Sequence, residues 1–302
     1  MNNPKIWVSG SRGFVGRHLV SALKDSRCEL RCVTKGDIRG EEVIYVDFSR
    51  RSHIRKVINS QGVPDIFIHL GWGSVYEPQS EVHLTSNISD GKNLIDELYE
   101  CGLKKFILVG SSSEYGDREG PLSEDMEPMG RLTNYVKGKM ELSSYGFEAA
   151  KRLDKAFIHI RLFYAFGAGQ HKNSLISQLY RSYLEKTTMN LSPCEHYRDY
   201  IYISDVVKGI QFISDLDESA IVNLGSGRVI QLRDFVRSLW QELGGDPGHL
   251  IFGAHQRPGN EPGQPYCFSN PANLNRLTRW TPSISVEEGI GKTVEALKEM
   301  GV

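Results

Sequence analysis

The chain has 302 residues, of which 39% are hydrophobic and 24% are charged, as in ordinary globular proteins. This composition excludes a disordered chain, a collagen-like repeat and a disulfide-framed secreted module, and the length suffices for one large domain or for a large and a small one. The 36 Lys and Arg residues nearly balance the 37 Asp and Glu residues, so charge favours a small-molecule ligand over nucleic acid.

The first half of the chain alternates short β-rich runs with longer amphipathic runs, the order of a parallel sheet with helices on both faces. Ligands of such sheets bind beyond the carboxyl ends of the strands, so the residues that follow each strand are the most informative about function. The predicted strands are Lys5–Val8, Glu29–Val33, Val43–Val46, Ile66–His69, Lys105–Val109 and Phe157–Leu162, and the predicted helices are Val15–Lys24, Ser86–Cys101, Val136–Arg152, Asp205–Ile213, Leu232–Leu243 and Val286–Met300.

Beyond Gly167 the pattern loosens, because Gly and Pro become frequent and strands stand alone. Tyr200–Ile203 and Ile221–Leu224 are expected to be strands that rejoin or flank the main sheet. The fold class is therefore a Rossmann-type doubly wound parallel α/β sheet with a smaller α/β substrate-binding region. The dinucleotide-binding domain is expected to comprise residues 1–165 and about 196–225, and the substrate-binding domain residues 166–195 and 226–302.

The first strand ends in a glycine-rich turn, Gly10-Ser11-Arg12-Gly13-Phe14-Val15-Gly16, after which a helical pattern begins. Gly10 permits a tight turn, Gly13 lets the backbone approach a pyrophosphate, and Gly16 allows the helix to pack closely on the strand. The position after the first strand favours dinucleotide binding over a plain glycine-rich turn. The predicted cofactor residues here are Gly10, Arg12, Gly13, Phe14, Val15 and Gly16.

Charge at the end of the second strand bears on which dinucleotide binds. NAD-binding proteins usually place Asp or Glu there to accept a hydrogen bond from the ribose 2′-hydroxyl, whereas this chain has Lys35. Arg12 and Lys35 suit the 2′-phosphate of NADPH, which a carboxylate would repel. The alternative is that both are solvated surface charges. We predict NADPH/NADP as the cofactor, with NAD as the alternative.

Asp47 and Phe48 follow the third strand and are further candidates for contact with the adenine of the cofactor. Asp47 is equally suited to cap a helix that begins there.

Tyr135 and Lys139 stand four residues apart, on one face of a predicted helix. An unperturbed tyrosine has a pKa of about 10 and is a poor acid–base catalyst near neutral pH unless a nearby ammonium stabilises its phenolate. Lys139 supplies such an ammonium. The spacing alone is common in helices, but together with the glycine turn upstream it indicates a catalytic pair.

Further motifs accompany the glycine turn and this pair: His69-Leu70-Gly71, Asn87, Gly110–Gly116, Arg161-Leu162-Phe163, Gly167-Ala168-Gly169 and Arg198–Val206. Their order resembles the extended short-chain dehydrogenase/reductase family, the NAD-dependent epimerase/dehydratase family, over essentially the whole chain. The resemblance implies a nucleotide-diphosphate sugar as substrate and cofactor contacts by Leu70 and Gly71. It also implies a homodimer formed through the Tyr135 helix and the Ser86–Cys101 helix.

The serine cluster after the fifth strand looks like the family's serine/threonine site. Counted from Tyr115-Gly116, Ser111 falls where the family places the hydroxyl that hydrogen-bonds the reacting oxygen of the sugar, with Ser112 as the alternative. These serines could instead satisfy backbone groups at the strand end. Ser112 and Ser113 stand where sugar-nucleotide dehydratases carry an acidic pair, so dehydration is disfavoured.

Predicted substrate contacts come from several parts of the chain. Arg198 and Arg257 match the two arginines with which the family holds the substrate pyrophosphate, although each could be a surface ion-pair residue. Tyr164 departs from the family's usual Asn, and Asn173 is a candidate contact nearby. Trp72, after the fourth strand, is expected either to line the sugar pocket or to pack in the core.

The five cysteines are odd in number and match neither a zinc ribbon nor a CxxC pair, so we predict reduced thiols and no metal site. The first residues lead directly into a short apolar run, without the pattern of a signal peptide. No apolar run approaches the roughly 20 residues of a membrane span. The sequence therefore predicts a cytoplasmic protein without membrane contact.

Within the family, Arg12 resembles GDP-fucose synthase, and the stretch Phe252–Leu274 resembles CDP-abequose synthase and related 4-keto reductases. We predict an NADPH-dependent oxidoreductase of deoxysugar biosynthesis that reduces the C4 keto group of a CDP- or dTDP-linked 4-keto-6-deoxyhexose. The alternative is a nucleotide-sugar 4-epimerase with tightly bound NAD. A non-catalytic dinucleotide sensor is a third reading, and Tyr135, Lys139 and Ser111 argue against it.

Overall fold

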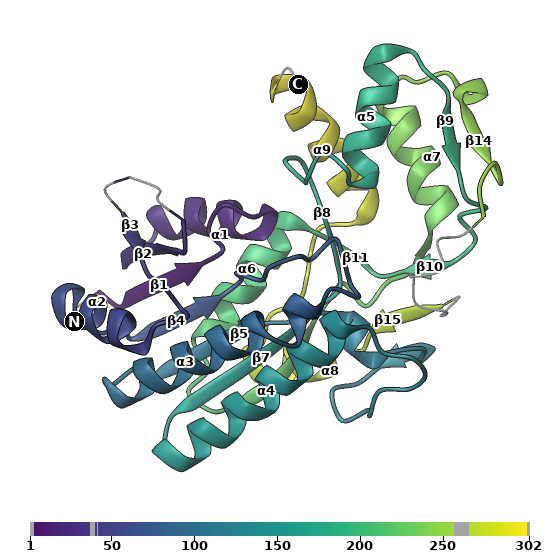
Figure 1. The fold of residues 1–302 in the computed structure, drawn as a ribbon. Helices are drawn as coiled ribbons and strands as arrows, with labels where there is room; N and C mark the ends of the chain where they lie inside the picture. Colours follow the sequence, from purple (N-terminus) through teal and green to yellow (C-terminus); the bar gives the residue numbers. More distant parts are fainter. Residues whose placement is uncertain (1–2, 37–39, 41, 257–265, 301–302) are drawn as a thin grey trace.

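The computed structural model describes residues 3–36, 40, 42–256 and 266–300. Its centre is a parallel sheet of seven strands in the order β12-β7-β5-β4-β1-β2-β3 (Figure 1). The chain builds outward from β1 to β3 and then returns to place β4 on the other side of β1, so the topological switch point lies between β1 and β4. The strands are β1 (Lys5–Ser9), β2 (Glu29–Thr34), β3 (Val43–Tyr45), β4 (Ile66–His69), β5 (Lys105–Val109), β7 (Ala156–Leu162) and β12 (Ala220–Leu224).

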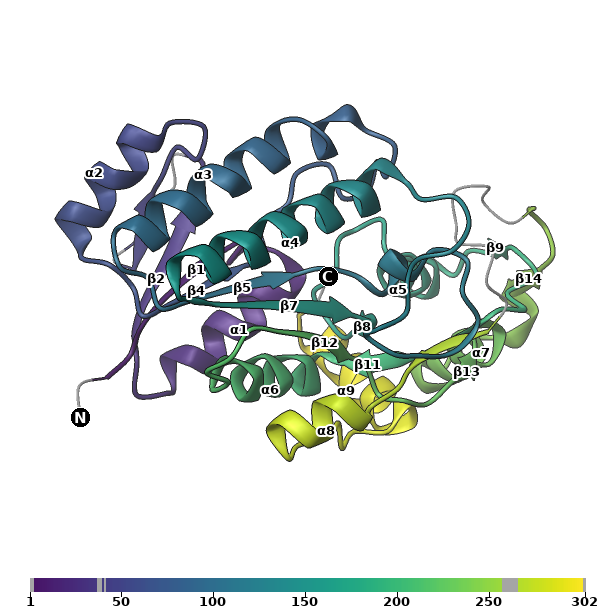
Figure 2. The same cartoon turned by 90° about the horizontal axis from the view of Figure 1, so that it is seen from below.

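Helices cover both faces of the sheet, because its central strands are apolar on both sides (Figure 2). In β5, Phe106 and Leu108 pack in the cluster under α2, α3 and α4, whereas Ile107 and Val109 pack in the cluster under α1 and α6. These helices are α1 (Phe14–Lys24), α2 (Arg51–Gln61), α3 (Ser86–Glu100), α4 (Asn134–Leu153) and α6 (Ile203–Ser214).

After β7 the chain enters a smaller region with its own core, in which Leu179, Phe235 and Val294 are buried together. Four two-stranded sheets accompany it, and one of them joins the distant segments β6 and β15. The remaining elements of the described chain, in this region and in the loops of the main sheet, are η1 (Glu81–His83), η2 (Ser112–Tyr115), β6 (Gly120–Leu122), β8 (Tyr164–Phe166), α5 (Leu175–Glu185), β9 (Met189–Leu191), β10 (Tyr197–Arg198), β11 (Tyr200–Tyr202), β13 (Ile230–Gln231), α7 (Leu232–Leu243), η3 (Pro247–His249), β14 (Leu250–Phe252), β15 (Cys267–Ser269), α8 (Ala272–Thr278) and α9 (Val286–Met300).

The fold class predicted from the sequence is confirmed, and the predicted strands of the sheet agree with the observed ones to within one residue at either end. The later strand β12 pairs with β7 and forms one edge of the main sheet. The sequence prediction missed the helices α2, α5 and α8. In α2 only Ile54, Val57 and Ile58 are buried, so its apolar stripe is short. The division into two domains at the stated residues stays a prediction.

Candidate active site

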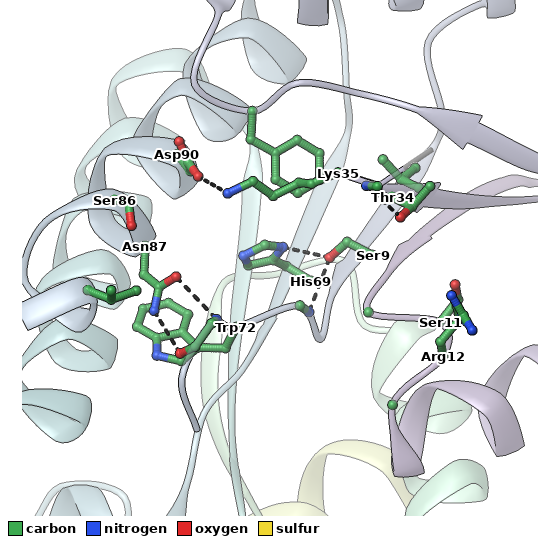
Figure 3. A pocket seen from close by; sticks show the side chains of 18 residues that line it. Ser9, Ser11, Arg12, Thr34, Lys35, His69, Trp72, Ser86, Asn87 and Asp90 are labelled. Carbon is green, nitrogen blue, oxygen red and sulfur yellow. Dashed lines mark hydrogen bonds and ion pairs between the residues drawn. The ribbon is translucent and has the colours of Figure 1, made fainter. Parts of the chain in front are cut away.

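A cavity of about 450 Å³ opens at the switch point, between the carboxyl ends of β1, β2 and β4 and the start of α3 (Figure 3). This is where open α/β sheets bind their ligands. Its size and its mixture of apolar and charged walls suit a small organic molecule. The predicted cofactor residues that line it are Gly10, Arg12, Gly13, Lys35, Phe48 and Gly71.

The glycine turn folds as its spacing predicts. Gly10 has φ +73°, and a Cβ there would lie 2.5 Å from the backbone nitrogen of Gly71, so only glycine lets the loops after β1 and β4 touch. A Cβ at Gly16 would collide with the carbonyl oxygen of Gly10, so this glycine lets α1 pack on the turn. Gly13 is the N-cap of α1 and has no side chain to cap it, which leaves the first helical amides open to an anion.

Seven other predicted cofactor residues are not among those that line the cavity; Gly16, Tyr135 and Lys139 are described separately, and the remaining four lie as follows. Phe14, Val15 and Leu70 pack against the buried cluster under the sheet. The Asp47 carboxylate accepts hydrogen bonds from the hydroxyl (2.6 Å) and the backbone N–H (3.1 Å) of Ser49, in the turn that precedes α2. These hydrogen bonds lower the Asp47 pKa. Contact of these four residues with the cofactor stays a prediction.

A hydrogen-bonded pair joins the ends of β1 and β4. Ser9 Oγ lies 2.7 Å from Nδ1 of His69 and accepts a hydrogen bond from the backbone N–H of Gly71 at 3.3 Å. Burial, with repulsion from Lys139 and Lys35, lowers the pKa of His69 to about 3. The imidazole is therefore neutral near pH 7 and adds no charge to the cavity.

The two predicted cations of the cavity differ in their surroundings. Lys35 forms an ion pair with Asp90 of α3 across the cavity, and its Nζ lies 5.8 Å from the centre of the Phe48 ring. Arg12 is exposed in the glycine turn, and its side chain makes no hydrogen bond or ion pair with the described residues. The cavity thus has an acidic group on the wall opposite the glycine turn, which the sequence prediction did not include.

Ser111 and Tyr135 meet at the end of β5. Ser111 is the N-cap of η2, and its Oγ accepts a hydrogen bond from the backbone N–H of Ser113 at 3.1 Å. Tyr135 lies in the first turn of α4. Its pKa is raised by burial and by the charge of Glu114, while a hydrogen bond with the Ser111 side chain opposes the change. The phenol is therefore protonated near neutral pH, and it can release its proton to a substrate only where a nearby positive charge stabilises the phenolate.

Lys139 is buried one helical turn after Tyr135, and its Nζ donates a hydrogen bond to the carbonyl of Val109 at 2.7 Å. Burial lowers its pKa to about 7, although Glu114 acts in the opposite direction. The Lys139 ammonium lies 4.0 Å from the centre of the Trp72 ring. Trp72 also contacts Tyr135 edge to face and lines the cavity. Its contact with the sugar of a substrate stays a prediction.

The predicted substrate residues are dispersed in the structure. Ser112 is buried behind Ser111, and Asn173 is exposed in the loop before α5. Arg198 is buried, with its guanidinium 5.4 Å from the centre of the Tyr164 ring. Arg257 lies outside the described residues. Their contact with a substrate stays a prediction.

Several residues that line the cavity were not predicted as site residues, although His69 and Asn87 belong to the family motifs noted in the sequence. Ser9 and His69 are the last residues of adjacent parallel strands, a signal that polar residues at strand ends could have given. Asn87 exchanges two hydrogen bonds with the backbone of Gly73 and so holds the loop after β4. Asp90 follows Asn87 by one helical turn on the same face of α3. Its pairing with Lys35 depends on two segments that meet only in the folded protein.

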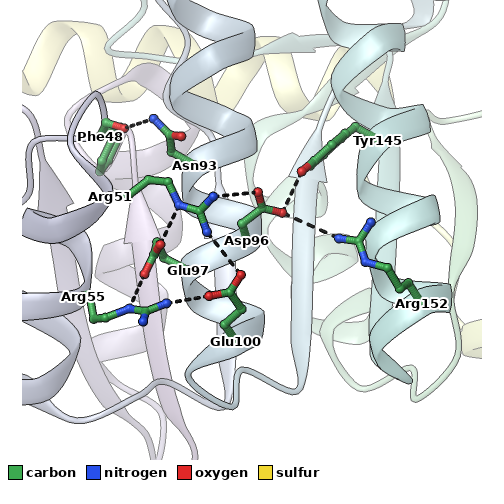
Figure 4. A network of polar contacts seen from close by, with 9 residues as sticks. All are labelled: Phe48, Arg51, Arg55, Asn93, Asp96, Glu97, Glu100, Tyr145 and Arg152. Atoms are coloured by element: carbon green, nitrogen blue, oxygen red, sulfur yellow. Dashed lines mark hydrogen bonds and ion pairs between the residues drawn. The ribbon is translucent and has the colours of Figure 1, made fainter.

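An ion-pair network on α2, α3 and α4 holds the helices that carry Asp90, Tyr135 and Lys139 (Figure 4). The buried Glu97 carboxylate accepts hydrogen bonds from Arg51 and Arg55, each at 2.6 Å. The neighbouring contacts are Arg51 to Asp96 and Glu100, Arg55 to Glu100, and Tyr145 and Arg152 to Asp96. These charges lie on the helices through which a homodimer was predicted, and the dimer stays a prediction.

Glu97→Gln is expected to lower the free energy of unfolding at pH 7 by about 1–3 kcal/mol, because two charge-assisted hydrogen bonds are weakened. Burial alone would raise the Glu97 pKa, but Arg51 and Arg55 outweigh burial and lower it. The stabilisation is therefore present above the ordinary carboxyl pKa and is lost as the pH falls through the folded-state pKa. Urea unfolding measures the difference in free energy of unfolding between the wild type and Glu97→Gln, and this difference should be smaller below pH 4 than at pH 7. The control is Glu100→Gln, which changes an exposed carboxylate and should alter the stability little at either pH.

Two searches of the described residues bear on other kinds of site. No group of three or more His, Cys, Asp or Glu side chains in this part of the chain is placed to hold a metal ion. None of the described helices combines the length and the apolar character needed to cross a membrane.

Comparison with known proteins agrees with this architecture. Residues 6–225 match the model of the NAD dependent epimerase/dehydratase family. UDP-glucuronate 4-epimerase of Thermodesulfobacterium geofontis is 28% identical over 72% of this chain and 67% of its own length. CDP-abequose synthase of Salmonella typhimurium is 24% identical over 96% of this chain and 97% of its own.

Solved structures show the same fold. UDP-glucose 4-epimerase of Thermotoga maritima, solved with UDP-glucose, has a TM-score of 0.88 at 19% identity and covers 99% of this chain and 100% of its own. MoeE5 in complex with UDP-glucuronic acid and NAD has a TM-score of 0.83 at 20% identity, over 98% of this chain and 99% of its own. The 4-epimerase and the synthase are thus similarly distant from this chain in sequence. The chain belongs to the NAD dependent epimerase/dehydratase family and is an NAD(P)-dependent enzyme.

Proposed function

We propose that this enzyme reduces the C4 keto group of a nucleotide-diphosphate 4-keto-6-deoxyhexose with NADPH. The observation that carries the proposal is the placement of Tyr135 and Lys139 on one face of α4, both against Trp72, which lines the cavity together with Arg12 and Lys35. A ketone reductase needs an acid to protonate the developing alkoxide, whereas an epimerase must begin by removing a proton from a sugar hydroxyl. The cations Arg12 and Lys35 in the cavity suit the 2′-phosphate of NADPH and favour the first reaction.

The residues of the cavity fit a nicotinamide dinucleotide. The glycine turn leaves room for a pyrophosphate at the start of α1, and Gly10, Gly13 and Gly71 would hold it. Arg12 and Lys35 would hold the 2′-phosphate, and Lys139 the nicotinamide ribose. When bound, NADPH supplies the hydride for C4.

Side chains of the protein would supply the proton for the C4 oxygen and the positive charge that stabilises the phenolate of Tyr135. Ser111 would donate a hydrogen bond to the C4 carbonyl oxygen, and Tyr135 would give it the phenolic proton as negative charge develops. The Lys139 ammonium would stabilise the resulting phenolate until it regains a proton. Arg198 and Arg257 would hold the substrate pyrophosphate, and Asn173 and Ser112 are further proposed contacts.

Arg12→Ala is expected to raise the KM for NADPH by about 10- to 100-fold, because a charge-assisted hydrogen bond to the 2′-phosphate is lost. The KM for NADH should change by less than about threefold, since NADH lacks that phosphate. The control is Arg27→Ala, which removes an exposed arginine beyond the far end of α1. Initial rates at varied concentrations of each cofactor give the two KM values. An equal rise of the KM for NADPH and for NADH in Arg12→Ala would contradict a 2′-phosphate site at Arg12.

A second candidate function is a nucleotide-sugar 4-epimerase that retains NAD. The ion pair between Lys35 and Asp90 favours it, because Asp90 offsets one of the two positive charges proposed for the 2′-phosphate. Two relatives in the comparisons are named as 4-epimerases. Extraction of cofactor from the purified protein separates the two candidates: stoichiometric NAD supports the epimerase, and protein that binds added NADPH supports the reductase.

The reductase is tested by following NADPH oxidation with a panel of CDP-, dTDP-, GDP- and UDP-linked 4-keto-6-deoxyhexoses, with the product identified by NMR. We expect turnover with a CDP- or dTDP-linked substrate and a hydroxyl at C4 of the product. Interconversion of C4 epimers without net oxidation of NADPH would overturn the proposal.

A further inference from the structure

A buried group of charged and titratable side chains lies beneath Ser111 and is not used in the reaction above. Glu114 of η2 is 1% exposed, and both its oxygens are engaged. One oxygen accepts a hydrogen bond from the backbone N–H of Ser111 at 2.8 Å. The other accepts from Nε2 of His159 at 2.7 Å and from Nε of Arg161 at 3.4 Å. The Ser111 backbone is thus tied to two side chains of β7 through one carboxylate.

The fold provides a closely fitted place for this carboxylate. A Cβ at residue 110 would collide with the Glu114 carboxylate and would lie 2.6 Å from Cε1 of His159, so Gly110 lets both side chains fit under the end of β5. His159 is fully buried, and its Nδ1 has no hydrogen-bond partner among the described residues. Among the described residues, the His159 imidazole therefore makes its hydrogen bond to Glu114. Burial of the unpaired Nδ1 costs free energy, which other contacts of the fold must offset.

The charge of Glu114 reaches the predicted catalytic residues. Burial would raise its pKa, but His159, Arg161 and the Ser111 amide outweigh burial and lower it, so the carboxylate is ionised near neutral pH. That charge raises the pKa of both Tyr135 and Lys139. The other titratable groups near Tyr135 and Lys139 are His83 of η1, whose ring contacts Tyr135, and His69 of β4, whose pKa is lowered by Lys139, while His159 and Arg161 of β7 contact Glu114 itself. Among these named groups, Glu114 alone is a carboxylate.

We propose that Glu114 is a positioning residue for this active site: it fixes Ser111 through the backbone amide, and its negative charge balances the Lys139 ammonium from below. The assignment of catalytic consequences rests on the proposed function. The effect of the Glu114 charge on the Lys139 ammonium does not rest on the proposed function, because it involves only these two side chains of the protein.

The electrostatic part is tested without any substrate, by NMR titration of Lys139 in protein labelled at the lysine ε-carbon, with the signal assigned from Lys139→Met. In Glu114→Gln the amide oxygen can still accept from Ser111, but the charge is gone. We expect the titration midpoint of Lys139 to fall by about one pH unit or more. The matched control is Glu124→Gln, which removes a neighbouring carboxylate that is bonded to the backbone of Asn223 and not to Ser111. An unchanged midpoint in Glu114→Gln, or an equal shift in the control, would overturn the charge role.

The positioning part is tested by kinetics with the substrate found in the panel. Glu114→Gln should lower kcat by about 10-fold or more and move the basic limb of the kcat/KM profile to lower pH, because the charge that raises the Tyr135 pKa is removed. Glu114→Asp keeps the negative charge, but its shorter side chain reaches the Ser111 amide less well. The titration midpoint of Lys139 should therefore stay close to the wild-type value, whereas kcat should recover only in part. If the Gln variant does not fold, the Asp variant decides, and full kcat in it would refute the positioning role.

A merely structural role gives a different pattern. It predicts a lower melting temperature with unchanged pH profile and unchanged Lys139 midpoint. If the wild-type enzyme turns over no 4-keto sugar, the proposed reaction fails, while the lysine titration still decides whether Glu114 supplies charge to the site.

Discussion

Tyr135→Phe is expected to lower kcat by about 10²- to 10⁴-fold, the usual contribution of a positioned general acid. The ring keeps its edge-to-face contacts with Trp72 and His83, so the fold and the cavity should be preserved. Only the phenolic proton and the hydrogen bond with Ser111 are removed. Steady-state rates of NADPH oxidation measure the loss, and the dissociation constant for NADPH should change little.

The matched control lies on the same helix. Tyr145→Phe removes a phenol that donates to Asp96 at 2.7 Å on the outer side of α4, away from the cavity, and should keep full activity. Retention of more than about a tenth of the activity in Tyr135→Phe would contradict the assignment of the acid, because water rarely replaces a positioned acid that well.

Lys139→Met is expected to reduce kcat/KM by about 10²- to 10³-fold, since it removes the only charge proposed to stabilise the phenolate of Tyr135. The methionine keeps much of the packing against Trp72 but leaves the Val109 carbonyl without its 2.7 Å hydrogen bond. Lys137→Met, which changes an exposed residue of the same helix, is the control and should keep its activity.

The same variant carries a pH-dependent stability signature. The pKa of Lys139 is about 7 in the folded protein, against an ordinary value of 10.5, so between these two pH values the unfolded chain binds more protons than the folded one. Wild-type stability should therefore rise with pH in this window relative to Lys139→Met, at most by about 1.4 kcal/mol per pH unit. Urea unfolding at pH 7 and pH 9.5 measures the trend, and parallel curves for the two proteins would show that burial does not lower the pKa.

The hydrophobic pattern predicted the strands of the sheet well, because a run of apolar residues and the turn residues that bound it are both local features of the sequence. The strands β4 and β5 are short, wholly apolar and bounded by turns, so their ends agree with the prediction. Helix α2 was missed because its apolar stripe is short, with only Ile54, Val57 and Ile58 buried, and its Arg51 and Arg55 pair with Glu97 of another helix. Such pairing depends on contacts between separate segments and leaves no periodic pattern.

The sequence by itself determined the glycine turn, its place after the first strand, and the spacing of Tyr135 and Lys139 on one helix, because these depend on residues close together in the chain. Only the tertiary structure decided which charges share the cavity. Asp90 neutralises Lys35 across it, and Glu114 reaches Ser111 from below with His159 behind it. Coulomb energy and burial depend on distances between segments far apart in sequence, so the electrostatic character of the site is a property of the fold.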